Sequence, residues 1–380
     1  MGQLRPQDWS TAPLLGNHRL RRYVLVLFAW FAAGLTAQAP NFPDLAAQAK
    51  QARESDRLDD AIALYRKALA VRPAWAEGWW YLGTLLYDRD DYAGAAGALS
   101  KAAALSPQSG NVFAMWGLCE AQIGHDREAL EHLQKSRTLG LDEQGLHRVT
   151  FFTEGKLLLA LGEFSRAQEL LDSLAHEGAH EEELLDALGE SVLGIRPADL
   201  ASAGPTTREV VRKAGRAEQA AARGEVPEAL EAYTRFVADY PKLHNVQFAY
   251  GMFLVANHFD DQAVAAFRHE IENTPQHLLA RLGIAGILLN TDPAAGIPYA
   301  EQAVQLAPGL AEGHYLLGVL RLGTGDVDKA IVELETAEHK DPNDARVYFA
   351  LGNAYAKAHR MEDAARARAK FARLSKENPK

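Results

Sequence analysis

Apolar residues recur along this chain with the period of an α-helix. Two consecutive stripes, each on one face of a helix, are formed first by Trp79, Leu82, Gly83 and Leu86 and then by Ala95, Leu99 and Ala102. Pro107 closes the pair, because proline cannot continue the interior of a helix. Small residues such as Gly83 and Ala95 allow the two helices to approach closely. The pattern therefore predicts a helical hairpin.

The same residue types return every 34 residues, so the hairpin is a repeat. The period is shared by Ala61, Ala95 and Ala129, by Pro73 and Pro107, by Gly83 and Gly117, and downstream by Ala229 and Ala263, Pro241 and Pro275, Gly318 and Gly352, and Ala330 and Ala364. One hairpin cannot bury its apolar stripe alone, so neighbouring hairpins stack and the array becomes a superhelix. The sequence predicts an all-α solenoid of αα-hairpins.

The period divides the chain into about nine units. They cover residues 42–75, 76–109, 110–143, 148–180, 210–243, 244–277, 278–310, 311–344 and 345–378. Large residues in the first helices are expected in the hairpin cores, namely Trp79, Trp116, Phe151, Tyr250, Leu317 and Leu351.

Two intervals depart from the period. Gly117 and Gly155 lie 38 residues apart, which predicts a turn lengthened by four residues near 141–147. Between the fourth and fifth units, 184–195 has a helical pattern, whereas the turn formers of 196–205 predict a loop. We therefore expect an N-terminal array (42–180), a helical insert with a Pro/Gly linker (181–209) and a C-terminal array (210–378).

The repeated positions resemble those of the tetratricopeptide-repeat (TPR) family. The family pattern has a bulky residue, Leu-Gly, Tyr, Ala, an aromatic residue and a closing Pro. It is matched by Trp79, Leu82, Gly83, Ala95, Leu99, Ala102 and Pro107, and again by Tyr348, Leu351, Gly352, Tyr355 and Ala364. The resemblance implies a right-handed superhelix that binds other polypeptides and is not an enzyme.

The resemblance also implies where a partner binds. In TPR proteins the first helix of each hairpin lines a concave groove, and positions one, four, eight and eleven after the start of the unit face it. These positions hold Trp80, Thr84, Tyr87, Asn111, Phe152, Lys156, Asn245, Phe248, Met252, Tyr315, Val319, Arg346, Phe349 and Asn353, and also Glu77, Leu118 and Glu312. Such a groove suits protein or peptide segments with apolar anchors.

One subset of the family clamps a peptide C-terminus with Lys, Arg and Asn at set groove positions. Asn353 and Arg346 match that pattern, whereas Trp80, Phe152, Phe248 and Tyr315 replace its other members. The resemblance therefore does not extend to a complete carboxylate clamp.

The N-terminus has the order of a secretory signal: Arg19, Arg21 and Arg22, an apolar run over 23–35, and small residues after it. The run of 13 residues is shorter than the roughly 20 that a bilayer-spanning helix needs. We expect a signal peptide at 1–37, cleaved after Ala37, and a periplasmic or secreted protein. If the segment is retained, the protein is held at the membrane.

Charge and cysteine content exclude other classes of protein. A net charge of −10 argues against nucleic acid as a partner, because neutralising phosphates requires a basic surface. Cys119 is the single cysteine, so a disulfide framework and a cysteine metal cluster are both excluded. No cofactor is expected.

One string has the form of a catalytic motif. His176-Glu177-Gly178-Ala179-His180 matches H-E-x-x-H, in which two histidines on one helix bind zinc and the glutamate activates water. A zinc-dependent peptidase is therefore the alternative function. In the repeat register, however, the string falls where one hairpin ends, with Gly178 as a helix C-cap and Glu181, Glu182 and Glu183 in the first turn of the next helix. We expect neither a metal site nor catalysis here.

Overall fold

The computed structural model describes residues 41–141, 144–179, 181–201 and 205–377, and in these ranges it is helical without strands. The first hairpins pair α1 (Phe42–Glu54) with α2 (Leu58–Val71), α3 (Ala76–Tyr87) with α4 (Tyr92–Leu105), α5 (Gly110–Gln122) with α6 (Asp126–Leu139), and α7 (Gln144–Leu161) with α8 (Phe164–His176). After α9 (Glu182–Leu193) and α10 (Pro197–Ala201), the later hairpins pair α11 (Pro205–Ala222) with α12 (Val226–Asp239), α13 (Val246–Ala256) with α14 (Asp260–Asn273), α15 (Leu278–Leu288) with α16 (Pro293–Leu306), α17 (Ala311–Thr324) with α18 (Val327–Lys340), and α19 (Ala345–Lys357) with α20 (Met361–Glu377).

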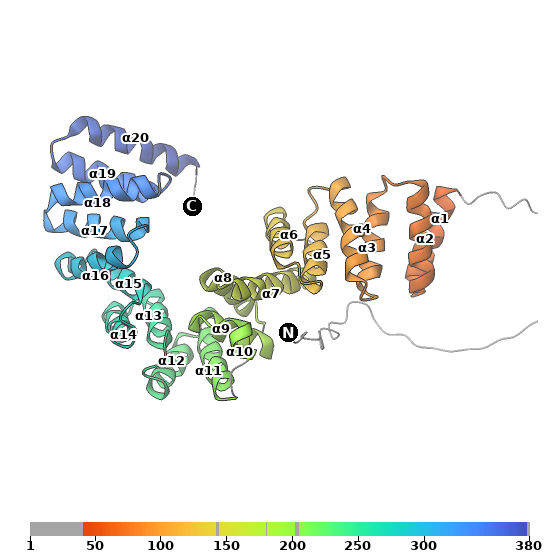
Figure 1. Ribbon diagram of the computed structural model, residues 1–380, viewed down its shortest axis with the longest axis horizontal. Helices are drawn as coiled ribbons and strands as arrows, with labels where there is room; N and C mark the ends of the chain where they lie inside the picture. Colours follow the sequence, from red (N-terminus) through yellow and green to blue (C-terminus); the bar gives the residue numbers. More distant parts are fainter. Residues whose placement is uncertain (1–40, 142–143, 180, 202–204, 378–380) are drawn as a thin grey trace, which may run out of the picture.

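The hairpins stack in chain order into a curved array (Figure 1). The α1–α2 hairpin stands at one end and the α19–α20 hairpin at the other, while α7 to α13 form the bend between them (Figure 1). Nine hairpins are found in the described residues, which agrees with the units read from the period. The prediction of an all-α solenoid of αα-hairpins is confirmed.

The two helices of a hairpin approach closely at a glycine. A Cβ added to Gly83 would lie 2.6 Å from Cγ of Leu99 in the partner helix. The same spacing of 16 residues recurs at Gly117 and Leu133, Gly155 and Leu171, Gly251 and Phe267, Gly318 and Leu334, and Gly352 and Arg368. The repeated glycine therefore has a packing role, because the facing side chain occupies the space that its own Cβ would need.

The four extra residues before Gly155 lengthen a helix rather than a turn, which corrects the sequence prediction. Helix α7 has 18 residues, whereas α5 in the preceding hairpin has 13. Four residues are close to one turn of an α-helix, about 3.6 residues, so the insertion keeps the buried face in register.

The predicted loop at 196–205 is wrong in part. Residues 197–201 form the short helix α10, and α11 already begins at Pro205, where proline suits the first turn of a helix. Helix α9 coincides with most of the helical stretch predicted at 184–195, and it packs against both α8 and α11. The division of the array at 181–209 stays a prediction.

The six predicted core residues divide into two groups. Leu317 and Leu351 are 2% and 1% exposed. The aromatic four, namely Trp79, Trp116, Phe151 and Tyr250, are half-buried and pack against the edges of the core clusters. Trp79 shows why: its indole Nε1 donates to the carbonyl oxygen of Pro73 at 2.8 Å, so the polar end of the ring stays near the surface.

The predicted signal peptide, residues 1–37, lies outside the described residues. Among the helices of the described chain, none has the length and apolar character that crossing a membrane requires.

Candidate functional site

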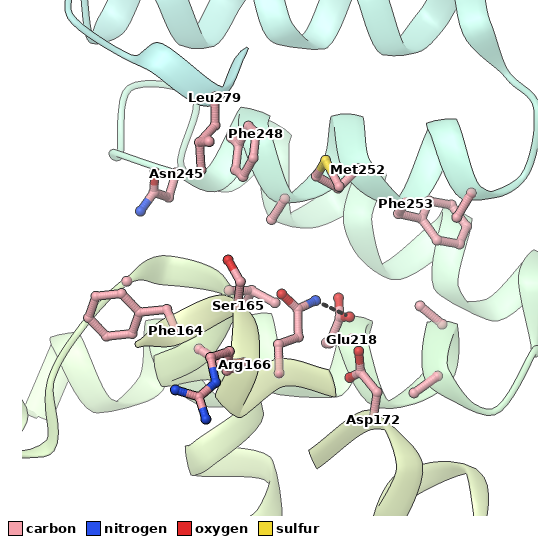
Figure 2. Close-up of a pocket in the computed structure, with 18 of the residues that line it drawn as sticks. Phe164, Ser165, Arg166, Asp172, Glu218, Asn245, Phe248, Met252, Phe253 and Leu279 are labelled. Carbon is pink, nitrogen blue, oxygen red and sulfur yellow. Dashed lines mark hydrogen bonds between the residues drawn. The ribbon is translucent and has the colours of Figure 1, made fainter. Parts of the chain in front are cut away.

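A cavity of about 650 Å³ lies at the bend of the array, between α8, α9 and α11 on one side and α13 and the start of α15 on the other. Figure 2 shows Asp172 and Glu218 across the open space from Phe248, Met252 and Phe253. We call Asp172 and Glu218 the acidic wall. We call Phe248, Met252 and Phe253 of α13, together with Leu279 of α15, the apolar wall.

The acidic wall is held by hydrogen bonds between three helices. Gln168 Nε2 of α8 donates to Glu218 Oε1 of α11 at 2.6 Å, and the hydroxyl of Tyr233 in α12 donates to Glu218 Oε2. The Asp172 carboxyl also hydrogen-bonds to Glu218, while Asp172 Oδ1 is buried without a hydrogen-bond partner. The two carboxyl groups therefore lie in contact, away from bulk water.

This burial favours the neutral forms of both acids. Removal from water raises the pKa of Asp172 to about 9, and the nearby charge of Glu218 adds to the shift. Burial likewise raises the pKa of Glu218 above its usual range, although the hydrogen bonds from Tyr233 and Gln168 oppose that effect. At neutral pH the Asp172 carboxyl carries a proton that it donates to Glu218.

The apolar wall follows from the helical spacing of α13. Phe248 and Met252 are four residues apart and therefore share one face of α13 at the cavity. Phe253 lines the cavity from an adjacent, more buried face of the helix. Met252 is 48% exposed and Leu279 49% exposed, which leaves large apolar side chains open to solvent at the cavity. Such a surface can bury an apolar group of a ligand.

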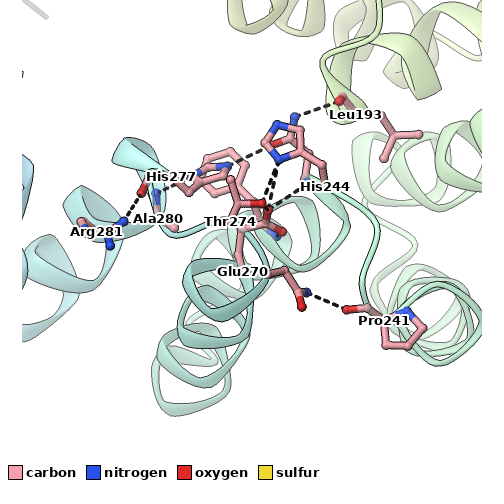
Figure 3. Close-up of polar contacts among 11 residues, drawn as sticks. Leu193, Pro241, His244, Glu270, Thr274, His277, Ala280 and Arg281 are labelled. Carbon is pink, nitrogen blue, oxygen red and sulfur yellow. Dashed lines mark hydrogen bonds and ion pairs between the residues drawn. The ribbon is translucent and has the colours of Figure 1, made fainter. Parts of the chain in front are cut away.

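A polar network fixes the position of α13 (Figure 3). Asn245, which has a left-handed backbone with φ of 66°, donates through Nδ2 to the carbonyl oxygen of Leu193 at the end of α9, at 2.8 Å. Glu270 accepts hydrogen bonds from the backbone N–H groups of Asn245 at 3.0 Å and Phe248 at 3.2 Å. The acceptor for these free N–H groups at the start of α13 thus comes from α14.

His277 completes the network. Its Nε2 lies 2.9 Å from Asn245 Oδ1, and its Nδ1 accepts from the backbone N–H of Ala280 at 3.1 Å, so Nε2 carries the ring proton (Figure 3). Burial lowers the pKa of His277, although the charge of Glu270 opposes the shift. A neutral His277 therefore links the start of α15 to the start of α13 beside the cavity.

The predicted groove residues are only partly brought together. Asn245, Phe248 and Met252 line the cavity. The remaining members lie on other hairpins along the array: Trp80, Thr84, Tyr87, Asn111, Phe152 and Lys156 toward the N-terminus, and Tyr315, Val319, Arg346, Phe349 and Asn353 toward the C-terminus. Phe349 is 56% exposed, so a second apolar surface is open near the C-terminal end.

Leu118 cannot belong to the groove, which corrects its selection from the sequence. It is only 4% exposed, because it continues the inner stripe of α5 and packs in the core with Ala114 and Leu133. Arg346 is exposed but engaged, since it pairs with Glu312 and Asp344 at 2.7 Å each and lies over the ring of Tyr315 at 4.8 Å. These pairs compete with any peptide carboxylate for the guanidinium.

The acidic wall was not found from the sequence. The groove rule selects only first helices of hairpins, whereas Asp172 lies on α8, a second helix. Glu218 lies on α11, a first helix, at position eight of the unit 210–243, a unit from which no groove residues were selected. A signal was nevertheless present: Glu218 follows Val211 and Ala214 at spacings of seven and four, so a charged residue occupies an apolar stripe. Only the packing of α8 on α11 shows that Asp172 meets it.

The H-E-x-x-H string does not form the helix that zinc binding requires. Helix α8 ends at His176, Glu177 is its C-cap, and Gly178 has a left-handed φ of 88°. His176 lies 3.2 Å from the carbonyl oxygen of Ala222, and residue 180 is outside the described chain. Gly178 ends α8 as expected, in the position after the C-cap. Glu182 and Glu183 lie in the first turn of α9 as expected, whereas Glu181 is the N-cap of that helix. The described ranges hold no group of three His, Cys, Asp or Glu suited to a metal ion.

Comparison with known families agrees with the hairpin geometry. Two models described as tetratricopeptide repeat match the chain, one over residues 46–110 and the other over 288–354. The chain carries tetratricopeptide repeats. TPR repeats support a protein-interaction scaffold, whereas nothing in the matches supports the alternative of a peptidase.

Solved structures with a similar chain path include MamA 41-end from Desulfovibrio magneticus RS-1. The match has 21% identity, covers 45% of this chain and 98% of that one, and has a TM-score of 0.43. The APC/C hetero-tetramer Cut9-Hcn1 matches at 15% identity over 89% of this chain and 80% of that one, with a TM-score of 0.35. No curated protein matches the TPR chain described here.

Proposed function

We propose that this TPR protein is a non-catalytic scaffold that binds segments of other polypeptides along its first-helix face, with the cavity at the bend as the main docking point. The observation that carries the proposal is the apolar wall. Its members Met252 and Leu279 are exposed to solvent, and the half-buried ring of Phe248 lies with them at a cavity of about 650 Å³. Pockets of this size and lining are typical of ligand sites.

The energetics favour a polypeptide partner. In protein interfaces a few well-buried aromatic and aliphatic anchors dominate the binding free energy, and the surrounding contacts mainly exclude water. Phe248 and Met252 can supply such anchors at the bend, and Trp80 and Phe349 can extend the contact toward the two ends of the array. An extended or helical segment with apolar side chains fits this distribution.

Export is part of the proposal. The basic, apolar and small-residue order of residues 19–39 supports a secretory signal, which would place the scaffold outside the cytoplasmic membrane. Its partners are then other envelope or secreted polypeptides.

Site-specific photo-crosslinking tests the proposal. A benzoylphenylalanine placed at Met252 should form adducts with polypeptides of the source organism's envelope, and the change Phe248→Ala should reduce them. The matched control position is Val332 on α18, which is 60% exposed and outside the cavity. If adduct yields are equal at positions 252 and 332 and are unchanged by Phe248→Ala, the binding surface lies outside the cavity.

A further inference from the structure

The acidic wall brings two acid groups into contact away from water, and no basic side chain of the described residues forms an ion pair with either of them. Glu218 is only 8% exposed, and Asp172 Oδ1 is buried without a hydrogen-bond partner. By contrast, the fully buried Glu154 has Arg137 at 3.3 Å, and Glu333 has Arg321 at 2.9 Å. Glu154 and Glu333 are thus each matched by an arginine of the protein itself.

The arginine in the cavity lining already forms an ion pair with another residue of the protein. Arg166 lines the cavity but forms an ion pair with Glu163, which lines it too. Within the described part of the chain, neither Asp172 nor Glu218 forms an ion pair with Lys, Arg or His. The lining therefore carries an excess of acid groups that faces the apolar wall across open space (Figure 2).

We infer that the cavity receives a lysine or arginine side chain of the bound polypeptide, with its methylene stem against Phe248 and Met252 and its charged end at Asp172 and Glu218. This inference rests on the proposed function and names the chemistry of its main anchor. Long cationic side chains have this dual character, because their stems bury against apolar surface while the head groups keep polar partners. Hydrogen bonds between such a cation and a carboxylate are among the strongest in proteins.

The shape of the site indicates that the bound cation belongs to a polypeptide rather than to a free small molecule. Met252 and Leu279 extend the apolar wall to the solvent-exposed edge of the cavity. A free small cation would leave this edge uncovered, whereas residues flanking a peptide lysine or arginine would cover it. The net charge of −10 also attracts basic segments over a longer range.

Peptide selection tests the inference with a defined probe. Random short peptides displayed on phage are selected on the full chain, and the selected peptides are then measured against three variants. Asp172→Asn/Glu218→Gln removes the acidic wall while preserving its shape, and Phe248→Ala tests the apolar wall. Glu154→Gln is the matched control, since it alters a buried acid outside the cavity. Circular dichroism checks the fold, and Glu218→Gln alone replaces the double variant if the latter is unfolded.

The selected peptides should share a lysine or arginine beside apolar residues. Asp172→Asn/Glu218→Gln should weaken them roughly 30-fold, the effect expected when one side of a buried charge pair is neutralised. Replacing that peptide residue with norleucine should remove the difference between the variant and the natural protein, and Glu154→Gln should leave binding unchanged.

The possible failures separate the two proposals. If peptides lack a shared cation and lose binding only with Phe248→Ala, the scaffold stands and the inference is wrong. If neither cavity variant weakens any selected peptide, or none is selected, both proposals are wrong. If free arginine amide binds as tightly as the selected peptides, the inference that the bound cation belongs to a polypeptide is wrong.

Discussion

Gly189 of α9 lies directly against the backbone of Val211 in α11. A Cβ added at Gly189 would be 1.9 Å from the carbonyl oxygen of Val211, and one added at Gly215 of α11 would be equally close to the carbonyl oxygen of Leu185. The two glycines face each other's helices, so α9 and α11 cross in backbone contact. This crossing brings Glu218 of α11 to the cavity and joins the insert to the repeats that follow it.

The Gly189 contact predicts a large effect from a single methyl group. Gly189→Ala should destabilise the protein by about 1–3 kcal/mol, because the methyl group meets backbone that cannot move aside independently. The matched control is Gly97→Ala in α4, where an added Cβ meets nothing within 4 Å. That change should stabilise the protein by about 0.5–1 kcal/mol, since alanine favours a helix interior over glycine. Urea unfolding of both variants measures the difference, and equal effects would contradict the close crossing.

Asp172 should make stability depend on pH. Its pKa is raised to about 9 in the folded chain, compared with about 3.9 when unfolded. The folded state therefore holds a proton that the unfolded state releases, and stability falls as pH rises from about 4 toward 9. Asp172→Asn keeps a neutral group in place, so its Tm relative to the natural protein should be higher at pH 8 than at pH 5.

The experiment measures the Tm of the natural protein and of Asp172→Asn at both pH 5 and pH 8. Glu190, whose pKa burial raises to about 7, also contributes to the pH dependence, but equally in both proteins. A Tm difference between the two proteins that does not change with pH would show that Asp172 is ionised in the folded state.

Partner capture should depend on aromatic residues far apart along the array. Trp80→Ala with Phe248→Ala should abolish capture of the polypeptide crosslinked at Met252, with a native circular dichroism spectrum, because interface aromatics often contribute 2 kcal/mol or more each, roughly 30-fold in affinity. The single variants separate the two ends of the surface. Val332→Ala on α18 is the control for a general loss of apolar surface, and undiminished capture by the double variant would place the partner elsewhere.

The mature protein should begin near Gln38. The intact mass of protein recovered from the envelope measures this directly. A species that retains residues 23–35 would contradict cleavage, and the scaffold would then be anchored in the membrane through that segment.

The hairpins were predictable because each one is specified locally. The apolar stripe of Trp79, Leu82 and Leu86 predicts a helix from spacing alone, and Gly83 marks where its partner helix approaches. The extra residues before Gly155 were assigned to the wrong element, because a four-residue insertion has the same length as a turn of helix. The signal at residues 196–205 was ambiguous for a similar reason, since proline is both a turn former and a good first residue of a helix.

By itself, the sequence determined the period, the helical hairpins, the stacking of neighbours and the helix cap at Gly178 that interrupts the zinc motif. The tertiary structure alone decided that Asp172, Glu218, Phe248 and Met252 share one cavity. Contacts within a repeat are fixed by spacings of three, four and 16 residues, and so they are visible along the chain. The cavity instead depends on the crossing of α9 with α11 and on the hydrogen bond from Asn245 to Leu193, which join residues whose separation follows no repeat period.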